Sequence, residues 1–184
     1  MPVKTILAIL LIILVISPIT IINPAYAGNK NQYESENIRI RVIPRSPQQI
    51  AAFYEARGFQ KNMLDKIKQY CFITIYVRNK GKHIIWHDLG KWTFQAGTKK
   101  IQRIDRHQLK QTWQKMGIPL PHQSTFRWTL LPEQLDFRPE EGEGGNIVLP
   151  ATNENIRITS QFNLYKNNSD DIVKLILDNI QCKK

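Results

Sequence analysis

Basic side chains are the residues best suited to binding chemistry in this sequence. The densest positive run surrounds one expected helix. A basic surface attracts anions such as lipid head groups, acidic polysaccharide, extracellular nucleic acid or an acidic protein. An envelope component or a protein is favoured here, with nucleic acid less favoured. The alternative is that the charge only keeps the domain soluble, because the other basic residues are scattered. The candidate anion- or partner-binding residues are Lys99, Lys100, Arg103, Arg106 and Lys110.

Four histidines supply the borderline ligands that copper or zinc would need. His83 and His87 are four residues apart, which on a helix would place them on one face. On the strand expected here they would stand about 13 Å apart, from a rise of about 3.3 Å per residue, too far for one ion. A metal-handling protein is therefore an alternative, and we predict no metal site and no cofactor. The metal candidates are His83, His87, His107 and His122.

Tryptophans could form a platform for sugar rings or bases. Trp86 and Trp92 flank a turn at Gly90 beside lysines and are the candidates for exposure. Trp113 shares a helical stripe with Leu109, which predicts that its side chain is buried.

Catalytic motifs are absent from the sequence. It contains no Gly-x-Ser-x-Gly elbow, no His-Glu-x-x-His helix, no Ser-x-x-Lys motif and no phosphate-binding glycine loop. No spacing selects a pair of carboxylates for acid–base chemistry. We therefore predict a protein that is not an enzyme, with an unrecognised hydrolase as an alternative.

The amino terminus is typical of a secretory signal peptide over residues 1–27. Lys4 precedes an apolar stretch, and Ala25-Tyr26-Ala27 matches a signal peptidase site. Removing residues 1–27 takes away one of 26 basic residues and none of the 15 acidic ones, leaving a net charge of +10. We predict a periplasmic or secreted protein with no transmembrane span after cleavage. The alternative is an uncleaved helical anchor, because the apolar stretch nears the lower length limit of about 17 residues for a spanning helix.

The two cysteines of the expected mature chain, Cys71 and Cys182, would reach an oxidising compartment. A lone pair in that setting favours a structural disulfide over a catalytic or metal site.

The remaining pattern predicts one domain over residues 38–184, preceded by a flexible segment over 28–37. Ser46, Pro47 and Gln49 predict a helix start, and Asp105 predicts another. Strands are expected at 38–42, 71–77, 92–94, 147–149 and 156–164. We expect residues 83–89 to return as a hairpin partner of 71–77, 125–131 to be extended, and 140–145 to be a flexible turn. Residues 172–180 fit a strand or a helix, and a strand is favoured because 167–170 resembles a hairpin loop.

Short strands separated by turns predict a mainly β fold with α insertions. The expected architecture is an antiparallel immunoglobulin-like sandwich or a partly open barrel, with two or three short helices. Three segments, at 49–59, 71–74 and 125–133, resemble a group of uncharacterised exported bacterial proteins. That resemblance supplies no activity and no site residues. We therefore expect a non-enzymatic binding or accessory module of the cell envelope, with an unknown ligand and oligomeric state.

Overall fold

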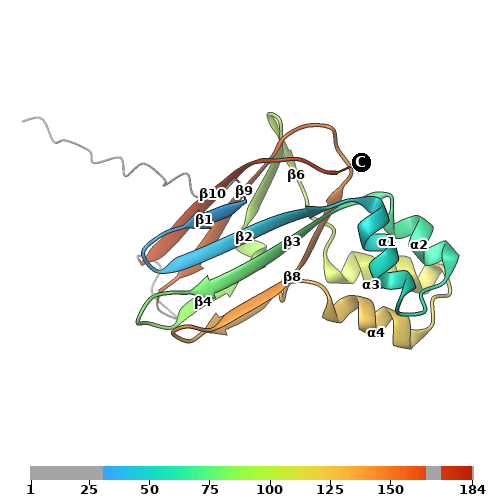
Figure 1. Cartoon of the computed structure of the whole chain (residues 1–184), viewed down its shortest axis with the longest axis horizontal. Coiled ribbons are helices and arrows are strands. Elements are labelled where there is room, and N and C mark those ends of the chain that lie inside the picture. Colours follow the sequence, from blue (N-terminus) through green and yellow to red (C-terminus); the bar gives the residue numbers. More distant parts are fainter. Residues whose placement is uncertain (1–30, 165–170, 184) are drawn as a thin grey trace, which may run out of the picture.

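Two β-sheets pack against each other, and four short helices gather at one end of them (Figure 1). The computed structural model describes residues 31–164 and 171–183, in which the fold is mainly β. This confirms the expected sandwich-like class, with four α-helices instead of two or three. The expected signal peptide and the expected loop at 167–170 lie outside the described residues.

The first sheet has four antiparallel strands in the order β1-β2-β3-β8. In β2 every second residue, Ile38, Ile40 and Val42, is buried, as the alternation of apolar and basic residues predicts. The prediction of a flexible segment over 28–37 is wrong for its middle part, because Gln32–Glu34 pairs with β2. The bounds are β1 Gln32–Glu34, β2 Ile38–Arg45, β3 Tyr70–Asn79 and β8 Gly142–Pro150.

The glycine-rich segment is part of strand β8, and the expected flexible turn over 140–145 is wrong for residues 142–145. Gly142 to Gly145 continue the pairing of β8 with β3. A side chain on Gly145 would stand 2.3 Å from the backbone nitrogen of Leu131, and one on Gly142 would stand 2.6 Å from the Tyr76 hydroxyl. The glycines therefore permit close packing of this strand against its neighbours.

The second sheet is built around β9, which pairs with β10 on one side and with β5 and β4 on the other. The expected hairpin of residues 83–89 with β3 is wrong, because β4 crosses to this sheet and pairs with β7 and β9. Residues 172–180 form a strand, as favoured. The bounds are β4 Ile85–Asp88, β5 Thr93–Ala96, β6 Lys99–Ile101, β7 Gln134–Phe137, β9 Ile156–Asn163 and β10 Ile172–Ile180.

The larger apolar core lies between the two sheets and takes residues from both, including Ile73 and Leu149 from one and Ile158 and Phe162 from the other. Cys71 on β3 and Cys182 after β10 form a disulfide, with Cα atoms 5.5 Å apart. The cysteine pair expected from the sequence thus connects the first sheet to the end of the second.

The helices build a second core on the outer face of the first sheet. Helix α1 begins with the expected capping box of Ser46 and Gln49, and α3 begins with one of Asp105 and Gln108. Each box satisfies free backbone N–H groups of the first turn. The bounds are α1 Pro47–Glu55, α2 Lys61–Ile67, η1 Leu89–Lys91 (a 3-10 turn), α3 Arg106–Lys115 and α4 Leu120–Trp128.

The expected extended segment over 125–131 is wrong, because most of it belongs to α4 and its C-terminal end. Pro121 lies in the first turn of the helix, where proline is tolerated because its missing N–H would have no partner there and its fixed φ suits a helix start. The alternation Phe126-Arg127-Trp128 imitates a strand, but only Phe126 is buried, against Tyr54 and Trp113. Within the described residues no helix is both long and apolar enough to cross a membrane.

Candidate anion-binding groove

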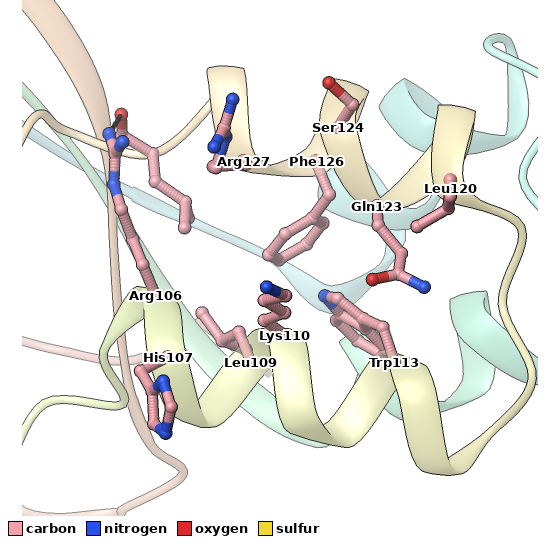
Figure 2. Close-up of a pocket in the computed structure, with 11 residues that line it drawn as sticks. Arg106, His107, Leu109, Lys110, Trp113, Leu120, Gln123, Ser124, Phe126 and Arg127 are labelled. Atoms are coloured by element: carbon pink, nitrogen blue, oxygen red, sulfur yellow. Dashed lines mark hydrogen bonds between the residues drawn. The ribbon is translucent and has the colours of Figure 1, made fainter.

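A groove of about 480 Å³ runs between α3 and α4 (Figure 2). Its floor is apolar, because Leu109 and Trp113 of α3 face Phe126 and Leu130 from the α4 side, and all four are buried. This volume lies within the range of about 300 to 1,000 Å³ typical of small-molecule sites. The groove can therefore accept an apolar group several carbons long.

Cations stand at the rim of this groove. Lys110 and Arg127 are exposed on α3 and α4, and neither forms an ion pair with any described residue. The Arg127 guanidinium lies 5.6 Å from the centre of the Trp128 ring. No carboxylate is among the residues that line the groove. An apolar floor with positive charge at its edge suits a ligand that has one apolar part and one anionic part.

Arg106 also lines the groove but is held by its own protein. Its Nη2 donates to the carbonyl oxygens of Leu130 at 2.9 Å and Leu131 at 3.2 Å, and its Nε lies 4.0 Å from Glu133 Oε1. Burial lowers the pKa of Arg106, and Glu133 opposes that shift. Arg106 thus ties the start of α3 to the segment after α4, and its charge is partly neutralised.

The expected basic run does not form one surface. Arg103 donates to Glu133 through both terminal nitrogens, and its side chain is only 17% exposed. Lys99 and Lys100 are exposed but lie on β6 of the second sheet, outside the groove. Of the five candidates, the structure brings Arg106 and Lys110 to the groove and separates the other three from it.

The tryptophan expectation is wrong for Trp92. This side chain is 4% exposed and packs its ring against His87 and Phe162, while its Nε1 donates to the Gln161 carbonyl at 3.2 Å. Trp86 is partly exposed and lines a different cavity, beside Asp88. The exposed tryptophan is Trp128, at 77%.

The histidines are dispersed. His87 is buried in the main core, its Nε2 donates to the Pro132 carbonyl at 3.0 Å, and burial lowers the pKa of its ring. His107 of α3 lines the groove and contacts Gln111, and His122 packs against Phe59. His83 is exposed and precedes β4. Within residues 31–164 and 171–183, no three His, Cys, Asp or Glu side chains gather as metal ligands would.

Sequence reasoning missed Arg127 and Trp128 because their segment was expected to be extended. The signal that could have found them is the pair Pro119 and Pro121, which marks a helix start. On a helix, Gln123 and Arg127 fall one turn apart on the face that lines the groove.

Two solved structures of Bacillus subtilis proteins are weakly similar to this chain. One is described as a "putative lipoprotein (ycdA)", with 12% identity and a TM-score of 0.46 over 83% of this chain. The chain spans 39% of the length of that protein. The other is the yjhA protein, with 8% identity and a TM-score of 0.46 over 81% of this chain and 96% of that one. No protein-family model matches the chain, and no curated protein does. Similarities this weak assign no function.

Proposed function

We propose that this protein is a non-enzymatic binding module of the cell envelope, and that its ligand is an amphipathic anion held in the groove between α3 and α4. The observation that carries the proposal is the combination of a buried apolar floor with unpaired cations at its rim. The apolar part of the ligand contacts Leu109, Trp113 and Phe126. Its charged group lies near Lys110 and Arg127.

The disulfide is the observation that fits location in the envelope. Disulfides persist in oxidising compartments and are rare in reducing ones. The Cys71–Cys182 bond therefore supports an exported protein. The cleavable signal over residues 1–27 remains a prediction.

The groove is tested with octyl phosphate as the anionic probe and octanol as its uncharged counterpart, by isothermal titration calorimetry. We expect saturable binding of octyl phosphate, at least tenfold weaker binding of octanol, and weakening of octyl phosphate binding as salt rises. The double variant Lys110→Glu/Arg127→Glu should bind octyl phosphate at least tenfold more weakly. Both replaced side chains are exposed, so the fold should persist.

The matched control is Lys99→Glu/Lys100→Glu. It makes the same change in net charge on β6, away from the groove. If both double variants weaken binding equally, the attraction is a property of the net charge and the groove is not the site. Equal binding of octyl phosphate by wild type and the groove variant would also refute the proposal.

A further inference from the structure

A second cavity, of about 350 Å³, lies where the first turns of α1 meet the outer face of the four-stranded sheet. None of the residues that line it lines the groove between α3 and α4. Its apolar wall is Ile50 and Phe53 of α1, and its polar wall includes Thr74 and Asn146. Arg45 is the only charged residue among those that line it.

Arg45 differs from its neighbours on this face of the sheet. Arg39 and Arg78 form ion pairs with Glu34 and Glu140. Arg45 forms none with any described residue, and its one hydrogen bond among them runs from Nε to the Thr74 hydroxyl, at 2.9 Å. The N–H groups of both terminal nitrogens are therefore available to another partner. The Arg45 side chain that carries them is half-buried in the wall of the cavity.

A hydrogen-bonded network holds Arg45 in place. The Thr74 hydroxyl accepts a hydrogen bond from Arg45 and donates one to Asn146 Oδ1, at 2.7 Å. The backbone nitrogen of Asn146, a residue only 8% exposed, donates to the Thr129 carbonyl at 2.8 Å. The network thereby connects three strands, β2, β3 and β8, to the end of α4. These hydrogen bonds hold the guanidinium in position before any ligand binds.

The same network leaves few other donors in need of a partner. The Thr129 hydroxyl donates to the Phe126 carbonyl at 2.7 Å, so it accepts from Tyr54, 2.5 Å away. Burial raises the pKa of Tyr54 to about 12, so the hydroxyl stays protonated in mildly alkaline as well as neutral solution. The two hydroxyl groups that line the cavity, on Thr74 and Thr129, thus already donate within the protein, and the terminal nitrogens of Arg45 donate to no described residue.

We propose that this cavity is a second ligand site, which binds a small organic oxyanion through the two terminal nitrogens of Arg45. Arginine binds carboxylate and phosphate groups in a bidentate manner, because its parallel N–H bonds match their oxygens. The cavity is much larger than one such group, so the ligand also carries a ring or short chain against Ile50 and Phe53. No carboxylate lines the cavity to compete for Arg45.

The test titrates wild type and variants with phenyl phosphate and with benzoate, using benzyl alcohol as the uncharged probe, in a buffer without phosphate. Binding is followed by calorimetry and by the NMR signal of the Arg45 Nε–H group. We expect saturable binding of at least one of the two anions and a shift of that signal, with no binding of benzyl alcohol. Arg45→Gln should weaken anion binding at least tenfold, and Arg45→Lys should weaken it too, because lysine lacks the paired donors.

The matched control is Arg41→Gln. Arg41 is exposed on the same face of β2 and lies over the Tyr76 ring, but it does not line the cavity. Its replacement removes the same charge and should change affinity less than twofold. Equal weakening by the two variants, or full binding by a folded Arg45→Gln protein, would overturn the proposal, as would the absence of binding of both anions to wild type.

The two proposed sites can fail separately. Lys110→Glu/Arg127→Glu should still bind phenyl phosphate at the Arg45 cavity, and Arg45→Gln should still bind octyl phosphate in the groove. Loss of phenyl phosphate binding in the groove variant would show that the small anion binds there, and would overturn the second site alone.

Discussion

Basic side chains of this protein divide into those that bind a carboxylate of the same chain and those that do not. Arg103 belongs to the first kind, because it forms two hydrogen bonds with Glu133 and is mostly buried. Lys110 belongs to the second, on the exposed edge of the groove. Only residues of the second kind can offer their full charge to a ligand.

Arg103→Glu should therefore destabilise the protein, whereas Lys110→Glu should not. The first change removes charged hydrogen bonds worth about 1.5 to 3 kcal/mol and sets two carboxylates against each other. The second alters an exposed charge and should change the free energy of unfolding by less than about 0.5 kcal/mol. Urea denaturation of the two variants measures the difference, and equal midpoints would show that the Arg103–Glu133 pair contributes nothing.

The burial of a side chain could be predicted from the sequence where its position on one helical face determines it. It could not be predicted where burial depends on contacts between distant segments. Trp113 shares a helical stripe with Leu109, and both are buried. Trp92 is expected to be exposed because it adjoins a turn. Its ring instead packs against Phe162, which lies 70 positions further along the sequence. The Arg103–Glu133 pair depends on tertiary structure in the same way.

At the scale of elements, local chemistry predicted starts of helices better than the partners of strands. The sequence predicts a capping box at Ser46 and a helix cap at Asp105, because each depends on residues within four positions of one another. Strand β4 was assigned to the wrong partner because a turn after β3 suggests a hairpin, although the chain crosses instead to the second sheet. Residues 125–131 show the alternation that is typical of a strand. Most of them nevertheless belong to α4 and its C-terminal end, where Phe126 is buried in the second core.

The close packing of the β8 glycines can be tested by substitution. Gly145→Ala should cost about 3 kcal/mol, the upper part of the range for overpacking, because its Cβ would meet the backbone of Leu131. Gly144→Ala should cost about 1 kcal/mol, because the nearest atom, 3.1 Å away, belongs to the side chain of Tyr76 and can shift. Thermal unfolding followed by circular dichroism compares the two, and a larger loss in the Gly144 variant would contradict the packing described here.

Across the whole molecule, the sequence indicated a sandwich-like fold and a cysteine pair, and the structure contains both. It did not indicate the groove, because the groove requires α3 and α4 to lie side by side and α4 was not expected. A cavity is set by the arrangement of elements and has no local signal of its own.

The disulfide should contribute a large part of the stability of the molecule. The bond joins residues 111 positions apart, and closing such a loop stabilises a fold by about 4 to 5 kcal/mol when chain entropy dominates. For a domain of this size, each kcal/mol shifts Tm by about 2 to 4 °C, so Cys71→Ala/Cys182→Ala should lower Tm by about 8 to 20 °C. Reducing agent should lower the Tm of wild type similarly and leave the variant unchanged. A variant that melts within 2 °C of oxidised wild type would contradict this role.

Strand β10 has a consequence for aggregation. It pairs with β9 on one side, and no described strand pairs with its other side, although the Tyr33 hydroxyl of β1 donates to the Asp178 carbonyl near its end. Ile172 and Ile176 are exposed on one face of the strand. Such an edge can template the addition of another chain. Its pairing is irregular between Leu177 and Ile180, where Asn179 has a φ of 56°. Lys174 lies within the regular part, so two copies that met antiparallel about that residue would oppose like charges. These two features oppose the growth of fibrils from this edge.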